Sequence, residues 1–466
     1  MKILIALVAV AVIFYLSSLN WRHSVKALLF ILVIEGALRK WVLPQASDMI
    51  YFLKDLVLLG AYLKYYAFSD SERKIPVKSD LLKILIFLVT GWCSFQAFNP
   101  SLGSPIVGIF GLKAYLFYIP LMWMLPNLFT SEEELRQFVR SYLLLVIPIG
   151  ILGIVQYFSP ISSPINAYAP GEVDSVAAFN GHVRITGTFS YIGGYAIYLI
   201  VSFALLIPLL SINQPKWWRL ATIAELLLVT VNSFMSGSRG VVFAEVLFLL
   251  GYLAAQGFTR PASTIRLVKQ FLLPVIVVSL AASIWFQPAI DNFVLRATSN
   301  SDVSGRITNS FSSPLEFAQY KGLDGYGIGS TLPGGRALRS AFKLPPAEVI
   351  PVYFESEMGR ITLEIGPIGF LLWYGLRVSL LVALWLVFWQ LKRPFLRQLA
   401  LTAFLIHLIQ FNGQLIVNHT VLVYYWFLSG FIFLLPRLEQ IENWHRQQQL
   451  LQQNVPYSYL PNSPYQ

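Results

Sequence analysis

The residues best suited to chemistry lie between Asn232 and Arg360. The motif Ser-Gly-Ser-Arg-Gly at 236–240 interrupts two apolar runs, and a cation placed between membrane spans is costly and seldom accidental. A long polar segment follows a further apolar run, reaches Tyr353–Glu357 near its end, and is rich in arginine: Arg296, Arg306, Arg336, Arg339 and Arg360. This arrangement indicates an anionic ligand handled at a membrane surface.

The composition places the chain among integral membrane proteins. Of its 466 residues, 56% are hydrophobic and only 12% are charged, whereas soluble domains carry about 25% charged residues. Apolar runs of about 17–24 residues recur along the chain, each long enough to cross a hydrocarbon core of roughly 30 Å. No alternating strands of a barrel are seen, so we expect an all-α, polytopic transmembrane bundle. The net charge of +11 indicates cytoplasmic loops and anionic ligands rather than nucleic acid.

Hydropathy predicts about 12–13 membrane spans. They are Ile3–Leu19, His23–Ala37, Ile50–Phe68, Leu81–Ala97, Pro105–Leu128, Phe138–Phe158, Ser190–Leu210, Leu220–Phe234, Val241–Gln256, Val268–Phe286, Gly366–Trp389, Leu399–Phe411 and Val421–Leu435. Met1–Leu19 lacks a small-residue cleavage site after its apolar run, so we interpret it as a span and not as a signal peptide.

Lysine and arginine in the short loops predict the orientation. Four loops and a tail fall on one side, taken as the cytoplasm: Arg73, Lys74 and Lys78; Lys216 and Arg219; Arg260, Arg266 and Lys269; Lys392, Arg393 and Arg397; and the tail Arg437–Arg446. The segments Ser159–Phe189 and Gln287–Ile365 then face outward, and Arg39-Lys40 is an exception on that side. We expect a bundle over 1–436 in the inner (cytoplasmic) membrane with an extracytoplasmic active face, and a tail over 437–466 that is disordered from Gln447.

Several charged residues lie inside the apolar runs: Glu35, Lys54, Asp55, Lys113, Glu225 and Glu245. Pairing between helices and a direct functional role are both open for them. Lys54 and Asp55 are adjacent, so they point in different directions on a helix and need separate partners, whereas Glu35 and Arg39 form an i,i+4 pair. The histidines His182, His407 and His419 lack ligand spacing, so we expect no metal.

The middle of the outward segment is rich in glycine. Residues Gly322–Gly329 are Gly-Leu-Asp-Gly-Tyr-Gly-Ile-Gly, and such glycines let backbone amides approach an anion. A flexible turn is the simpler interpretation of this piece alone. The whole segment 287–365 is longer than a plain connector, which is typical of a functional or disordered region.

Four motifs in chain order resemble those of the O-antigen ligase and polymerase superfamily. Arg184–Phe189, which is Arg-Ile-Thr-Gly-Thr-Phe before a span, is similar to the family's Arg-x-x-Gly-Thr-Phe. The Ser-Arg-Gly at 238–240 resembles its turn between two spans. Ser304–Ile307 followed by Gly325–Gly329 is similar to its Arg…Gly-x-Gly segment.

The fourth motif departs from the family at one position. The ligase signature is histidine, then Asn, Ser or Gln, then nine residues, then Gly-x-x-Gly. Here Glu355-Ser356 stands nine residues before Gly366–Gly369, so glutamate replaces histidine. The resemblance covers roughly 180–372, less than half of the chain, and its four motifs occur in the right order.

The resemblance implies an enzyme like a C-type glycosyltransferase, with a catalytic outward loop. It would move a glycan from a polyprenyl diphosphate carrier to an acceptor glycan or lipid-linked sugar. Such a site needs cations for the leaving diphosphate and a base for the acceptor hydroxyl. Arg239 and Arg306 are expected on the diphosphate, Arg184 and Arg360 on the substrate as well, and Glu355 as the base. No cofactor or metal is then required, and no nucleic acid is an expected partner.

The glutamate places the chain away from ligases of lipid A core and nearer the polymerase-like members, which extend exopolysaccharide or O-antigen repeats. Alternatively, Glu355 and Glu357 pair with Arg360 or Arg336 and order the segment. Two other functions stay open. A transporter or flippase of lipid-linked sugars would share the bundle but would not need the long outward segment. A non-catalytic scaffold of a polysaccharide export complex would leave Arg239 and Glu355 without a role.

Overall fold

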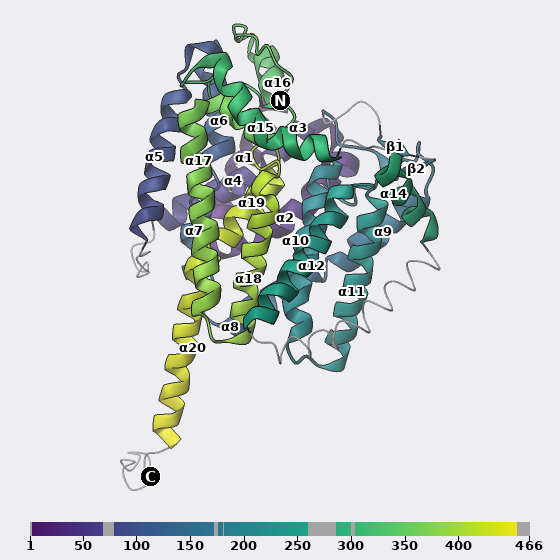
Figure 1. Ribbon diagram of the computed structural model, residues 1–466, viewed down its shortest axis with the longest axis vertical. Helices are drawn as coiled ribbons and strands as arrows, with labels where there is room; N and C mark the ends of the chain where they lie inside the picture. The colour runs from purple at the N-terminus through teal and green to yellow at the C-terminus, as the bar shows by residue number, and fades with distance from the viewer. Residues whose placement is uncertain are drawn as a thin grey trace.

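The computed structural model describes residues 2–68, 79–171, 176–179, 181–259, 286–299 and 303–453. This described chain is helical apart from a small antiparallel hairpin of β1 (Ala178–Phe179) and β2 (His182–Val183) (Figure 1). The first helices are α1 (Lys2–Leu19), α2 (Trp21–Ala37), η1 (Leu38–Val42), η2 (Pro44–Ala46), α3 (Ser47–Tyr51), α4 (Leu53–Tyr62), η3 (Leu63–Ala67), α5 (Asp80–Gln96), η4 (Pro100–Leu102), α6 (Pro105–Leu116), α7 (Leu121–Met124), η5 (Leu125–Asn127), α8 (Glu132–Leu143), α9 (Val146–Phe158) and η6 (Pro164–Asn166). After the hairpin come α10 (Ile192–Ser211), α11 (Lys216–Met235), α12 (Arg239–Thr259), α14 (Gln287–Ser299), α15 (Val303–Lys321), α16 (Pro333–Phe342), α17 (Glu357–Gln390), α18 (Pro394–Ile409), η7 (Gln410–Asn412), α19 (His419–Ser429) and α20 (Phe431–Gln453).

Among the described residues, eight helical stretches are long and apolar enough to cross a membrane. They are Pro105–Asn127, Glu132–Phe158, Ile192–Ser211, Lys216–Met235, Arg239–Thr259, Glu357–Gln390, Pro394–Asn412 and His419–Gln449. Each coincides with one predicted span, so the multi-pass helical class is confirmed with eight candidate spans in place of the expected 12–13. Three predicted spans before residue 100 form the continuous helices α1, α2 and α5 of 17 or 18 residues, the one at 50–68 is interrupted, and 268–285 lies outside the described residues.

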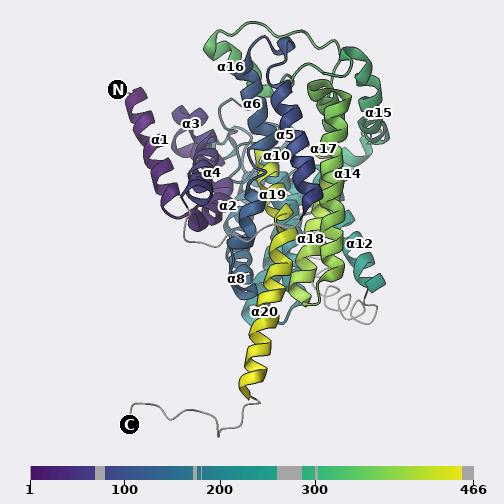
Figure 2. The same ribbon diagram turned by 90° about the vertical axis from the view of Figure 1, so that its left-hand side faces the viewer.

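The connections gather at two opposite ends of the bundle. In Figures 1 and 2 the N-terminus, α15 and α16 lie at the upper end, while α20 extends away at the lower end. At the lower end Arg393 pairs with Glu132, and the N–H of Lys392 donates to Glu439 at 2.7 Å. Segments 287–356 and 392–397 therefore lie at opposite ends, as the predicted orientation requires. Which end faces the cytoplasm stays a prediction, and the basic segments at 73–78 and 260–269 lie outside the described residues.

The segment expected as a long loop is largely helical. It contains α14, α15 and α16, and α15 packs along α17, where Gly359 stands against Phe317 and Ser313. The outward segment ends at Ser356 rather than at the expected Ile365. Ser356 caps the next helix, α17, by accepting a hydrogen bond from Gly359 N at 3.1 Å. At the C-terminus, α20 remains helical to Gln453, beyond the expected tail boundary at 437.

The helix α17 is folded back on itself at Gly366. This glycine has φ 68° and ψ 177°, which no helix contains, and Pro367 cannot donate to Leu363 O. A straight helix would separate Glu357 from Arg377 by about 30 Å. Both side chains instead bond to the short segment 410–416: Arg377 donates to Gln410 O, and Glu357 accepts from Leu415 N at 3.0 Å. The piece 357–365 is thus a half-helix that begins inside the bundle.

The span Pro105–Asn127 is broken between α6 and α7, at residues 117–120. Tyr62 donates to Phe117 O and Tyr66 donates to Pro120 O, each at 2.9 Å. The Tyr62 hydroxyl satisfies a carbonyl at the interruption, as a bilayer core demands, while Pro120 O also accepts from Trp123 N at 3.1 Å. The break is therefore a built feature of the bundle and not a frayed helix.

Candidate functional site

The turn at 184–189 joins several parts of the chain at the upper end. The side-chain oxygen of Gln156, at the end of α9, accepts from Gly187 N at 2.8 Å and from Thr186 N at 3.2 Å. Gly187 has φ +53°, and a Cβ there would stand 2.9 Å from the Tyr195 ring. Glycine is required at this position for both reasons. The turn is consequently fixed in shape, as a binding or catalytic segment needs to be.

Arg184 reaches the second motif across the molecule. Its Nε donates to Ser236 O at 3.2 Å, although the two residues are 52 positions apart. The Ser236 side chain in turn accepts from Ser238 N at 3.2 Å, which shapes the turn that leads into α12. Arg239 is the first residue of α12 and is partly buried. Two motifs that the sequence could only place in order are therefore neighbours in space.

The helices on either side of the 236–240 turn are locked together. Ser233 of α11 donates to the buried Glu245 of α12 at 2.6 Å. Asn232 accepts from Tyr195 OH at 2.9 Å and donates to Gly150 O at 3.1 Å, which ties α11 to α10 and α9. Glu245 and Asn232 are buried polar groups with partners, so they position the turn rather than act on a ligand.

Two further cations contact the 184–189 turn and its neighbour Ser190. Lys40, in η1, donates to Gly187 O at 2.7 Å and to Thr186 Oγ1 at 3.1 Å. Arg39 donates to Ser190 Oγ at 2.9 Å and to Ser47 at 3.0 Å. Burial of the Lys40 ammonium lowers its pKa to about 7. The sequence analysis did not assign Arg39 and Lys40 to the 184–189 turn. The signal that could have done so was their position on the predicted outward side, where basic residues are rare.

The glycine-rich segment surrounds an anion, and that anion belongs to the protein. Gly325, Gly327 and Gly329 all have positive φ, which bends the backbone around Glu364. The fully buried Glu364 accepts from Tyr115 OH at 2.9 Å, Gly329 N at 3.1 Å, Thr331 N at 2.9 Å and Thr331 Oγ1 at 2.6 Å. The amides approach an anion as one interpretation proposed, but the anion is a side chain that sequence reasoning did not single out.

The glycine-rich segment and the Gly366–Gly369 motif form one structural unit. Leu363 O, left open by Pro367, accepts from Tyr326 N at 2.7 Å. A Cβ on Gly366 would stand 2.0 Å from Leu323 O, so only glycine permits this contact. Two of the resembling motifs thus have a packing explanation here.

The acidic residues at the start of α17 have different surroundings. Glu355 is exposed and immediately precedes the capping Ser356. Glu357 is 1% exposed, and its Oε1 accepts from Leu415 N at 3.0 Å and Ile416 N at 2.9 Å. No described ion pair joins Glu357 to Arg360. Its carboxylate instead attaches the half-helix to the α18–α19 connection.

The other predicted substrate residues are placed less directly. Arg360 is buried and donates to Thr331 O at 2.8 Å, and its guanidinium lies over the Phe354 ring at 5.1 Å. Arg306 belongs to α15, but its side chain lies outside the described part of the structure. Arg336 is exposed on α16. Arg184 and the 236–240 turn are therefore the predicted elements that the structure visibly brings together.

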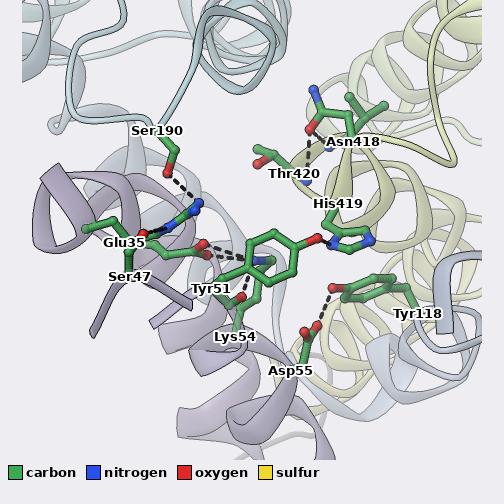
Figure 3. A network of polar contacts seen from close by, with 12 residues as sticks. Glu35, Ser47, Tyr51, Lys54, Asp55, Tyr118, Ser190, Asn418, His419 and Thr420 are labelled. Carbon is green, nitrogen blue, oxygen red and sulfur yellow. Dashed lines mark hydrogen bonds and ion pairs between the residues drawn. The ribbon is translucent and has the colours of Figure 1, made fainter. Parts of the chain in front are cut away.

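Among the described residues, five of the six charges within the apolar runs form ion pairs across helices, the exception being Glu245, and Figure 3 shows Glu35 with Lys54. Lys54 contacts both oxygens of Glu35 at 2.8 and 3.0 Å, and Lys113 contacts Asp55 at 2.6 Å. Lys54 and Asp55 have separate partners, as expected from their adjacency. Tyr118 donates to Asp55, and Tyr51 OH bonds to Nδ1 of His419 at 2.6 Å. Elsewhere, Arg140 pairs with Glu225 at 2.7 Å.

Comparison with known proteins finds no matching family model and no matching curated protein. The chain is a multi-pass helical membrane protein with eight candidate spans. Within the described ranges, no three His, Cys, Asp or Glu side chains gather as a metal ion would need.

Proposed function

We propose that the chain is a membrane glycosyltransferase of the polysaccharide polymerase or ligase type. It transfers or polymerises glycan repeats from a polyprenyl diphosphate carrier onto an acceptor sugar, in exopolysaccharide or O-antigen synthesis. The reaction takes place at the upper end of the bundle, which is the extracytoplasmic face of the inner membrane in this proposal.

One observation carries the proposal. Arg184 Nε and Ser236 O are 3.2 Å apart, so two arginine motifs meet at one end of the bundle. The half-helix that follows Glu355 starts inside the same bundle, and its anchor at Leu415–Ile416 is two residues from Asn418. Asn418 lies against Gly193 at the start of α10, immediately after the Arg184 turn. A continuous set of contacts thus connects the two regions.

The proposed chemistry assigns one task to each group. The acceptor hydroxyl oxygen bonds to the anomeric carbon, and the bond from that carbon to the diphosphate oxygen breaks. Glu355 takes the hydroxyl proton, while Arg239, with Arg184 and Arg306, holds the departing diphosphate through guanidinium forks. Arg360 acts through the glycine-rich segment, because its guanidinium bonds to Thr331.

Glu355 suits the base role better than Glu357. A base must reach the acceptor hydroxyl, and Glu355 is exposed to solvent. Glu357 is buried and already accepts two backbone hydrogen bonds. A substitution of Glu357 should therefore first loosen the α18–α19 connection.

The test is transfer by the purified chain in lipid nanodiscs, supplied with a polyprenyl diphosphate-linked oligosaccharide. Extension of the glycan and release of polyprenyl diphosphate, both lost in Arg239→Ala, would support the proposal. A folded protein that extends no glycan from any donor repeat of its own host would overturn it.

A flippase of lipid-linked sugars is the second candidate, and the break in Pro105–Asn127 favours it. Transporters place broken helices and buried ionisable residues near the middle of the membrane, and Asp55 meets both Lys113 and Tyr118 at this break. Proteoliposomes with a fluorescent lipid-linked sugar separate the candidates. Movement between leaflets without glycan extension would favour the flippase, and neither activity would favour a scaffold.

A further inference from the structure

The pair Arg39-Lys40 lies at the end of the bundle where basic residues are least expected. It follows α2 in the short helix η1, which the predicted orientation puts on the outward side. The two residues are only 5% and 6% exposed. Lysine and arginine are usually enriched on the cytoplasmic side of a membrane protein, so buried basic residues on the opposite side are expected to have a specific role.

Lys40 is held directly beneath the Arg184–Phe189 turn. It donates to Gly187 O at 2.7 Å and to Thr186 Oγ1 at 3.1 Å, and its ammonium lies 4.4 Å from the Trp41 ring centroid. These acceptors are neutral. No carboxylate among the described residues lies within ion-pair distance of Lys40 or of Arg184. Two cations therefore flank one turn without a compensating charge from the described chain.

A buried cation whose described acceptors are all neutral is stabilised when a negative charge approaches it. The same turn also holds a buried hydroxyl, Thr188 Oγ1, that has no hydrogen-bond partner among the described residues. A cation without a counter-charge and a hydroxyl without a partner are the groups that a phosphate oxygen would satisfy.

We propose that Lys40, which contacts the 184–189 turn, and Arg184, which begins it, bind a phosphate group, namely the diphosphate of the lipid-linked donor. The diphosphate identity rests on the proposed function, whereas the anion site rests on the contacts alone. Arg184 is partly exposed and supplies the fork at the rim. Lys40 supplies positive charge from below, and the hydroxyl of Thr188 donates to a phosphate oxygen.

Binding at this site takes up a proton. The pKa of Lys40 is lowered to about 7 by burial, so part of the population is neutral at physiological pH. A phosphate beside the ammonium favours its charged form and raises the pKa, so affinity is full below pH 7 and falls as pH rises above it. Arg39, Arg184 and Tyr168 are the other charged and titratable groups around the turn, and burial raises the pKa of Tyr168, which keeps it neutral. His182, stacked on Tyr157, is the neighbouring histidine.

The experiment measures binding by calorimetry, with the full chain in nanodiscs, between pH 6 and pH 9. The probes are a polyprenyl diphosphate-linked sugar, inorganic diphosphate and uncharged polyprenol. The sugar-linked diphosphate diester has no second phosphate ionisation near neutrality, so any proton taken up on binding comes to the protein. Repeating the titration in buffers of different ionisation enthalpy measures the number of protons taken up. The variants are Lys40→Met and Lys40→Arg, with His182→Gln as the control for the pH dependence. Lys26→Met is the matched control, because Lys26 pairs with Glu134 at the lower end.

We expect Lys40→Met to weaken binding of the diphosphate donor roughly 10- to 100-fold, the value of one charge-assisted contact. Proton uptake should disappear in Lys40→Met and in Lys40→Arg, while Lys40→Arg retains affinity at high pH. His182→Gln and Lys26→Met should behave like the wild type. A low yield of folded Lys40→Met leaves the Lys40→Arg measurement to decide.

Unchanged affinity and unchanged proton uptake in folded Lys40 variants would overturn the anion site. Binding of inorganic diphosphate but not of the lipid-linked donor would retain the site and remove the lipid assignment. Donor binding that depends on Lys40, without glycan transfer, would retain the site while the proposed function fails.

Discussion

Replacement of Glu364 by glutamine tests how the outward segment is held on the bundle. The carboxylate accepts four hydrogen bonds, two on each oxygen, from Tyr115, Gly329 and Thr331. Each carboxylate oxygen of Glu364 accepts from two donors. In glutamine, an NH2 group replaces one of these oxygens, so the two donors on that side lose their acceptor. Two charge-assisted bonds are worth about 3–6 kcal/mol, and the cheaper burial of a neutral amide offsets part of this. We expect a net loss of about 2–4 kcal/mol in the free energy of unfolding.

Two measurements check this value. Chemical unfolding in detergent reports the stability of the variant, and hydrogen exchange reports the amides of Gly329 and Thr331. A local loss of about 2 kcal/mol corresponds to roughly 30-fold faster exchange. Tyr115→Phe removes one donor only and should cost about 1–2 kcal/mol, which keeps the series informative if Glu364→Gln does not fold.

Glu348→Gln is the matched control on the same segment. Glu348 pairs with Lys321 at a partly exposed position, and such surface pairs contribute about 0–1 kcal/mol. A Glu364→Gln protein as stable as the Glu348→Gln protein, with unchanged exchange at Gly329, would refute the assignment of Glu364 as the anion that holds the glycine-rich segment.

Three further predictions concern function and orientation. Arg239→Ala, and also Arg239→Lys, should strongly reduce polymer production at normal membrane levels, because lysine keeps the charge but loses the fork; full activity of Arg239→Lys would disprove bidentate recognition. Glu355→Gln should cut turnover by about 10²–10⁴-fold with donor binding nearly intact, and a wild-type polymer yield would move the base elsewhere. Cysteine labelling from outside should reach Ser340→Cys on α16 but not Lys392→Cys at the lower end; labelling of both from one side would contradict the bundle.

The sequence predicted those features that depend on short stretches of chain. Hydropathy placed a predicted span at each of the eight candidate spans of the described chain, because every one contains an apolar run that stands out from its neighbours. Adjacency alone predicted that Lys54 and Asp55 would need separate partners, and they bind Glu35 and Lys113. The two arginine motifs were recognised from their residues, although not as neighbours.

Other features depend on contacts between residues distant in the chain, and a hydropathy profile does not report such contacts. Hydropathy began the predicted span at Gly366, because the preceding residues 357–365 include Glu357, Arg360 and Glu364, but it does not show that 357–365 is helical and folds back. The local signal of the fold-back is Gly366-Pro367, a positive φ followed by a residue that cannot donate. Spacing predicted Arg39 as a neighbour of Glu35, but it could not predict Lys54, which helix packing brings to both oxygens of Glu35.

The four resembling motifs do not carry equal functional weight once their contacts are known. Gly325–Gly329 and Gly366–Gly369 pack against each other and around Glu364, so a stable outward segment explains their glycines without any substrate. Arg184 has no such explanation, because its Nε donates to Ser236 O while no carboxylate among the described residues pairs with it. A charged group retained without a counter-charge is a better indicator of a ligand than a glycine retained for packing. Mutations of the glycine pairs should therefore lower stability and activity together, whereas substitutions at Arg184 should lower donor binding in a protein that remains folded.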